Sequence, residues 1–92
     1  MSEFLVSIDV VRPAGTDDEA WAAVTARERE RAGALRAAGT IARIWRVPGT
    51  RGNVGIWAAE DATALHAALE SLPLFPYARI EVRPLALHYL EA

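Results

Sequence analysis

The sequence predicts an α+β fold in which two helices cover one face of a four-stranded antiparallel sheet. The chain has only 92 residues, of which 52% are hydrophobic, so it has room for one domain over residues 1–92 and not for a second. Four segments have the apolar alternation or β-branched content of strands, and two have the composition of helices. Their order is strand, helix, strand, strand, helix, strand. This order is typical of the ferredoxin-like, or split βαβ, arrangement.

The first strand and the first helix fill the N-terminal part of the chain. Residues 4–11 alternate an apolar face with a mixed face, which indicates a strand that is covered on one side. Thr16 and Glu19 have the spacing of a capping box, so they predict the start of a helix over residues 17–38. Gly39 is the expected C-terminal stop of this helix.

A β-hairpin is predicted in the middle of the chain. Residues 41–47 and 54–58 have strand character, and the Pro- and Gly-rich segment 48–52 between them supplies the turn. The two strands follow each other so closely that they are expected to pair side by side.

The second helix and the last strand complete the order. Asp61 can cap a helix whose leucines recur at helical spacing until Pro73 ends it. A strand is then predicted over residues 77–82, and residues 85–88 are expected to extend it beyond Pro84.

The sheet face that the helices leave bare is predicted to be covered by a second copy of the chain. Alternation along the hairpin places Arg43 and Trp45 on one face, and Gly55 and Trp57 are expected on the same one. Two exposed tryptophans would form a large apolar patch on so small a protein. We therefore expect a homo-oligomer in which sheets pair between subunits.

Composition excludes several kinds of chemistry. The chain has no Cys, and all 10 of its cationic residues are Arg, so disulfides, thiolate nucleophiles and Schiff-base lysines are impossible. With 2 His and no Cys, no metal site is expected. The net charge of −2 does not suggest binding to nucleic acid or to an anionic membrane. Because no signal-like apolar run is found, the protein is expected in the cytoplasm.

Glu28 is the first candidate for chemistry. On a helical wheel it falls with Trp21, Val24 and Leu35, which span roughly 60°, inside the apolar stripe of the first helix. Burial disfavours the charged form of a carboxylate, so Glu28 is a candidate general base near neutral pH. The alternative is a buried ion pair between Glu28 and one of the many arginines, and the sequence leaves both readings open.

Arg43, Trp45 and Arg46 form a second candidate group within the strand at 41–47. Guanidinium groups pair with carboxylates and the indole N–H is a further donor, so this group can bind a carboxylate. The alternative is that arginine on an edge strand only prevents the edge from pairing with other chains.

Residues spread over nearly the whole chain carry a resemblance to a known family. The most specific are the Trp45–Arg46 pair and the Leu-Pro-Leu-Phe-Pro-Tyr segment at 72–77. The others are Phe4, Val6, Glu28, Gly39, Thr40, Gly49, Asn53, Leu65, His66, Ile80, Glu81, Val82 and His88. On these residues the chain resembles the muconolactone delta-isomerase family.

The resemblance implies a ferredoxin-like subunit that pairs sheet to sheet into a larger ring, decameric in the family's best-known members, with a pocket at subunit contacts. It implies a proton shift that needs no cofactor and moves the double bond of an unsaturated lactone, of the muconolactone to 3-oxoadipate enol-lactone type. Glu28 would be the base. Arg46 and Trp45 would bind the substrate carboxylate or the developing oxyanion. The further pocket candidates are Asn53, Tyr77 and His88, the last of which could reach a neighbouring subunit.

The chain departs from the family pattern at two places. Leu5 and Ser7 stand where the family has His and Lys, and Ala42–Arg43 stands where it has an Arg-His pair. These changes leave open a related tailoring or dehalogenating enzyme that acts on another lactone or enolisable carbonyl compound. A non-catalytic module that binds a small ligand is the remaining reading.

Overall fold

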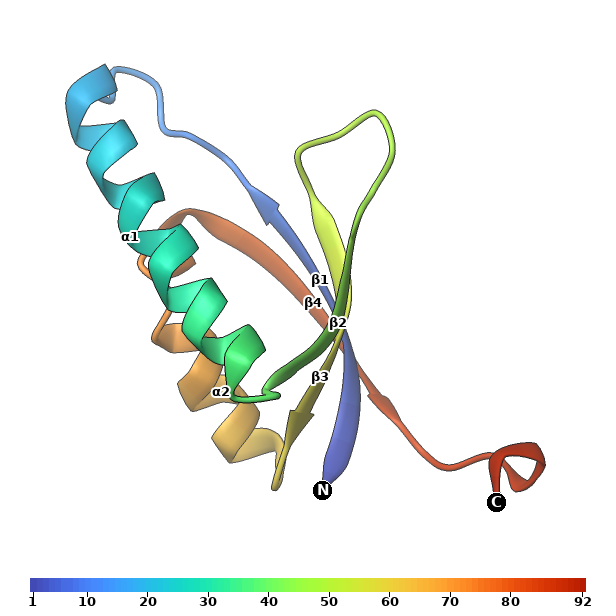
Figure 1. The fold of residues 1–92 in the computed structure, drawn as a ribbon. Helices are drawn as coiled ribbons and strands as arrows, with labels where there is room; N and C mark the ends of the chain where they lie inside the picture. The colour runs from blue at the N-terminus through green and yellow to red at the C-terminus, as the bar shows by residue number, and fades with distance from the viewer.

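The structure, a computed structural model, describes residues 1–92 and has the predicted order of elements (Figure 1). Its strands are β1 (Ser2–Val10), β2 (Ile41–Arg46), β3 (Asn53–Ala59) and β4 (Ala78–Leu85). Its helices are α1 (Asp18–Ala37) and α2 (Ala62–Glu70), with short 3₁₀ turns at Phe75–Tyr77 and Tyr89–Glu91. The prediction of a ferredoxin-like α+β fold is confirmed.

The four strands form one antiparallel sheet in the order β2-β3-β1-β4. Both helices lie on the same face of this sheet, and no element covers the other face (Figure 1). β4 is an edge strand, which explains why Pro84 is accommodated within it, since proline has no backbone N–H to offer to a neighbouring strand.

Each helix begins at an aspartate. The carboxylates of Asp17 and Asp61 accept hydrogen bonds from the backbone N–H three residues later, at 2.9 and 2.8 Å. The prediction for Asp61 is confirmed, whereas the prediction that Thr16 caps α1 is wrong by one residue. The Thr16 hydroxyl donates instead to the carbonyl of Pro13, at 2.6 Å. Gly39 follows the end of α1 with a φ of +84°, as expected for a glycine stop.

The hydrophobic core lies between the two helices and the covered face of the sheet. Ten buried residues form one cluster: Phe4, Val6, Ile8, Leu35, Ile41, Trp57, Ala59, Leu65, Leu69 and Leu72. Trp57 is the largest of them and is only 1% exposed. Its indole therefore anchors β3 against the helices.

The prediction that Trp57 and Gly55 share a face with Trp45 is wrong. The pairing of β2 with β3 shifts by one residue between Ile41 and Arg43. After this shift, each side chain of β2 lies on the other face of the sheet from the one that regular pairing would give it. Trp45 consequently lies on the bare face, while Trp57 lies in the core.

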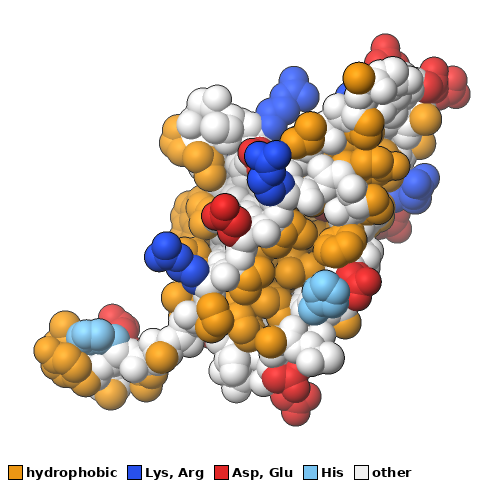
Figure 2. Space-filling view, turned by 180° about the vertical axis from the view of Figure 1, so that it is seen from behind, with side chains coloured by type: hydrophobic (Ala, Val, Ile, Leu, Met, Phe, Trp, Pro, Cys, Tyr) orange, Lys and Arg blue, Asp and Glu red, His pale blue; other side chains and the backbone are white.

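The C-terminal segment leaves the body of the protein. β4 ends at Leu85, so the prediction that residues 85–88 prolong this strand beyond Pro84 is confirmed for Leu85 and wrong for residues 86–88. The segment beyond it projects into solvent, and apolar side chains gather at its tip (Figure 2). Leu87, Tyr89 and Leu90 are between 74% and 79% exposed. Neither α1 nor α2 is long and apolar enough to cross a membrane.

Candidate active site

A cavity of about 690 Å³ lies between the N-terminal part of α1 and the end of the sheet that carries the β2–β3 turn. Its apolar wall includes Ile8 and Val10 from β1, Trp21 from α1, and Leu74 from the segment after α2. Its charged lining residues are Arg12, Glu28, Arg29, Arg46 and Arg51. Arg12 forms an ion pair with Asp18, but the other three arginines have no acidic partner, so the cavity favours an anionic ligand.

Glu28 lies in the wall of this cavity and is half-buried. The backbone N–H of Leu74 donates to its Oε1 atom at 2.9 Å, which fixes one side of the carboxylate. Its other oxygen, Oε2, makes no hydrogen bond within the chain. No arginine or histidine nitrogen lies within ion-pair distance of Glu28, since the ion pairs of the chain join Arg12 to Asp18 and His66 to Glu70. The chain therefore does not form the predicted alternative, an ion pair of Glu28 with an arginine.

Arg46 and Asn53 are cross-strand neighbours at the hairpin end of β2 and β3, and both line the cavity. The Nη1 atom of Arg46 donates to the carbonyls of Arg51 and Gly52, the latter at 3.3 Å, so the turn holds this guanidinium in place. The side-chain Oδ1 of Asn53 is buried and has no hydrogen-bond partner. This oxygen is therefore an acceptor that is available to a hydrogen-bond donor of a ligand.

Arg12 and Trp21 also line the cavity, although the sequence did not single them out for binding. The Arg12 guanidinium lies over the Trp21 ring, 5.7 Å from its centroid. The position of Trp21 could be predicted from a helical wheel, because residues seven positions apart, such as Trp21 and Glu28, lie on the same face of a helix. Arg12 gave no comparable signal, because its place depends on how the loop after β1 folds back.

Three predicted site residues lie outside this cavity. Trp45 is 45% exposed on the bare face of the sheet, where the Arg43 guanidinium lies 4.8 Å from its ring centroid. Tyr77 contacts Trp21 edge to face, with ring centroids 5.5 Å apart, but does not belong to the cavity wall. His88 lies on the projecting C-terminal segment, far along the chain from every lining residue. The structure thus brings together Glu28, Arg46 and Asn53.

Metal ions have no evident place in this structure. No group of three His, Asp or Glu side chains lies close enough together to hold one. The chemistry available in the cavity is that of a carboxylate, an amide and several guanidinium groups.

Comparison with known proteins agrees with this architecture. The family model described as muconolactone delta-isomerase matches residues 2–91. The chain belongs to the muconolactone delta-isomerase family. It is 38% identical over 88 residues to the muconolactone delta-isomerase of Rhodococcus opacus, across 96% of this chain and 95% of the relative.

Other members of the muconolactone delta-isomerase family give the same result. Muconolactone delta-isomerase 1 of Acinetobacter lwoffii is 39% identical over 85 residues, which cover 92% of this chain and 88% of the relative. A crystal structure of muconolactone isomerase superimposes with a TM-score of 0.88 at 36% identity, over 95% of this chain and 91% of the other.

Two β1 residues that the sequence analysis singled out, Leu5 and Ser7, lie outside the Glu28 cavity. Leu5 and Ser7 pair with Ile56 and Val54 of β3, and all four face away from the helices. Ser7 is not among the residues that line the cavity. Leu5 and Ser7 therefore belong to the bare face of the sheet.

Proposed function

We propose that this protein is an isomerase that moves the double bond of an unsaturated lactone, in a reaction of the muconolactone to 3-oxoadipate enol-lactone type. One observation carries the proposal: a half-buried carboxylate, Glu28, has one oxygen fixed by Leu74 and the other free, with no cation paired to it. The names of its relatives in Rhodococcus opacus and Acinetobacter lwoffii support the choice of substrate. Such a substrate is an intermediate of small-molecule metabolism, so the proposal places the protein in the cytoplasm.

Glu28 would act first as a base and then as an acid. Its free oxygen, Oε2, takes the proton from the ring carbon γ to the carbonyl, and the electron pair of that C–H bond moves into the ring to give a dienolate. The same oxygen returns the proton to the carbon α to the carbonyl, so the double bond moves and no atom is gained or lost. One carboxylate serves both carbons because both lie on the same small ring. No cofactor takes part in either step.

Arg46 and Asn53 would stabilise the dienolate. Negative charge gathers on the carbonyl oxygen when the proton leaves, and fixed N–H donors lower the energy of that charge. Arg46 is held by the carbonyls of the hairpin turn, so it does not have to be ordered when the substrate binds. Asn53 lies opposite it in the register and lines the same cavity, so the N–H group of its side chain can donate to the same oxygen.

We also propose that the chain associates with copies of itself across the bare face of the sheet. That face carries Trp45, 45% exposed, at one edge and Leu85, 42% exposed, at the other. Burying such side chains stabilises an assembly. In that assembly Trp45, Tyr77 and His88 would take part in substrate binding through a neighbouring subunit, because each lies outside the cavity of its own chain. Light scattering on the purified protein tests this part, and a monomer at micromolar concentration would contradict it.

Muconolactone in deuterated buffer tests the reaction itself. NMR would follow migration of the double bond, and deuterium at the α carbon would report exchange of the Glu28 proton with solvent before its return. Glu28→Gln keeps the shape of the side chain and removes the base, so we expect turnover to fall by about 10²- to 10⁴-fold. Glu30→Gln is the matched control, because Glu30 is exposed on the same helix and does not line the cavity.

The outcome separates the enzyme from a ligand-binding module. Turnover that vanishes in Glu28→Gln and survives in Glu30→Gln supports the proposal. Folded wild-type protein that neither exchanges deuterium nor isomerises the lactone contradicts it. Equal turnover in wild type and Glu28→Gln would leave the isomerase reading in place but remove Glu28 as its base.

A further inference from the structure

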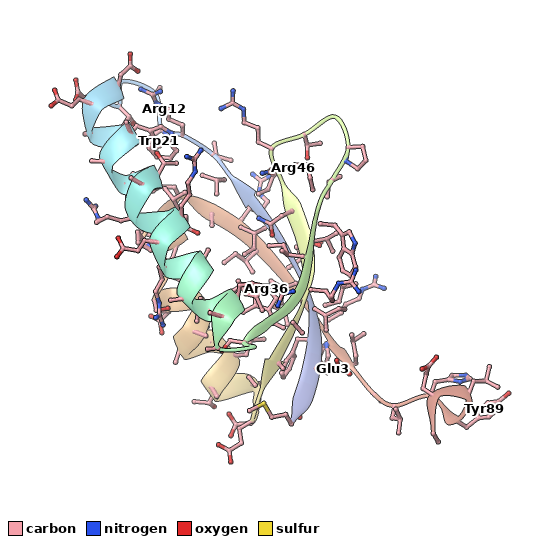
Figure 3. All side chains as sticks on the ribbon, in the orientation of Figure 1. Glu3, Arg12, Trp21, Arg36, Arg46 and Tyr89 are labelled. Atoms are coloured by element: carbon pink, nitrogen blue, oxygen red, sulfur yellow. The ribbon has the colours of Figure 1, made fainter.

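Arg12 is a second positively charged group in the cavity that is held in a fixed position. Figure 3 shows Arg12 and Trp21 at the N-terminal end of α1, and Arg46 across from them at the hairpin end of β2. All three line the same cavity. The reaction proposed above uses Arg46 and leaves Arg12 without a role.

The position of Arg12 is set by three contacts. Its Nη2 atom donates to the carbonyl of Thr16 at 2.7 Å and forms an ion pair with Asp18. Its guanidinium lies over the ring of Trp21, which packs in turn against Tyr77. A side chain held in this way loses little further freedom when it binds a ligand.

Arg12 keeps donors that these contacts do not use. Its Nε and Nη1 atoms make no hydrogen bond within the chain, and its side chain is 39% exposed. The other cavity arginines differ from it. Arg46 donates Nη1 to the hairpin turn, whereas the guanidinium groups of Arg29 and Arg51 have no partner that would hold them. Arg12 is therefore the cavity arginine that is both fixed by an ion pair and able to donate from Nη1.

We propose that Arg12 binds a carboxylate carried by the substrate, with Trp21 packed against the neighbouring part of the ligand, and that this pair makes the cavity selective for acidic lactones over neutral ones. A charge-assisted hydrogen bond is roughly twice as strong as a neutral one, so it can discriminate an acid from its ester. The inference takes its substrate from the proposed function, but it concerns binding and not proton transfer.

Two probes of the same shape and different charge test the inference. Muconolactone and its methyl ester would be titrated by calorimetry into the Glu28→Gln variant, in which turnover does not consume the acid. We expect the acid to bind on the order of tenfold more tightly than the ester. Adding Arg12→Gln to this variant should remove most of that difference, because the acid loses its partner and the ester loses little.

Companion variants separate binding by Arg12 from a general effect of charge. Arg27→Gln removes one positive charge from an exposed position on α1 that does not line the cavity, so it should keep the preference for the acid. Asp18→Asn removes the carboxylate that competes with a ligand for Arg12 without touching the cavity wall, so this variant should keep the preference for the acid. Circular dichroism confirms that each variant is folded.

Three results would overturn the inference: no binding of the acid, equal binding of acid and ester, or a preference for the acid that survives Arg12→Gln. The outcome does not depend on the proposed reaction. If the preference collapses in Arg12→Gln while the wild type fails to isomerise muconolactone, the carboxylate site stands and the proposed function fails. If the wild type isomerises muconolactone and the preference for the acid survives Arg12→Gln, the proposed function stands and the carboxylate site at Arg12 fails.

Discussion

The two faces of the sheet differ in what their side chains do. On the covered face, Phe4, Val6 and Trp57 are at most 4% exposed and form the centre of the core. The bare face carries a mixture of apolar and charged side chains, with Trp45 and Arg43 stacked on each other in solvent. Strand alternation separates the two sets so sharply that Trp45 and Arg46, adjacent in the chain, lie on opposite faces.

The covered face itself changes along its length. Toward the hairpin turn, the inward positions of β3 pass from Trp57 through Gly55 to Asn53. Those of β2 pass from Ile44 to Arg46 over the same distance. On β2 and β3, the residues that line the cavity are the polar ones at this end, Arg46 and Asn53. The candidate site is therefore the end of the core where polar residues enter it, whereas the bare face is a separate surface.

Replacing one tryptophan on each face should give the largest difference. We expect Trp57→Ala to lower the free energy of unfolding by about 3–5 kcal/mol, because it leaves a cavity in the core. The matched variant Trp45→Ala should cost little in an isolated chain, since its side chain is already half in solvent. Urea denaturation of both variants measures these losses.

Protein concentration sharpens the same comparison. If the bare face binds a second copy, any loss caused by Trp45→Ala grows with protein concentration, as mass action requires. The loss caused by Trp57→Ala should not depend on concentration. If the loss caused by Trp45→Ala is the same at every protein concentration, the division between a core face and an association face is contradicted.

A smaller effect is expected where β2 crosses the covered face. A Cβ atom at Gly55 would lie 2.6 Å from the carbonyl oxygen of Arg43, at the point where the register shifts. Gly55→Ala should therefore destabilise the fold by about 1–3 kcal/mol, because backbone has to move to accept one methyl group. Thermal unfolding followed by circular dichroism measures this loss. An unchanged melting temperature would mean that the β2 backbone can shift at little cost. The register of β2 against β3 would then be less fixed than the structure indicates.

Much of the fold could be predicted because local signals agree with it. The strand alternation in β1, the Asp61 cap and the Gly39 stop all act within a few residues of where they are read. The faces of the hairpin could not be predicted, because one register shift near Arg43 exchanges them and leaves no mark in the pattern of residues. The end of β4 escaped prediction because it depends on where β1 stops pairing with it.

The candidate site was predictable in part for the same reason. Glu28 stands out on a helical wheel, since a carboxylate in an apolar stripe conflicts with burial. Arg46 was grouped with Trp45 by proximity in the chain, although only Arg46 faces the cavity. The link from Leu74 to Glu28 spans 46 residues of sequence, so only the folded chain brings the donor to its acceptor.

The smallest effect is expected at a position that belongs to neither face of the sheet. Gly33 lies in the C-terminal half of α1, and a Cβ atom there would meet nothing within 4 Å. Gly33→Ala should therefore raise the free energy of unfolding by about 0.5–1 kcal/mol, because alanine loses less conformational freedom than glycine on entering a helix. Turnover should not change, since Gly33 does not line the cavity. A loss of stability that grows with protein concentration would show that a second copy packs against α1, so that association would not be confined to the bare face.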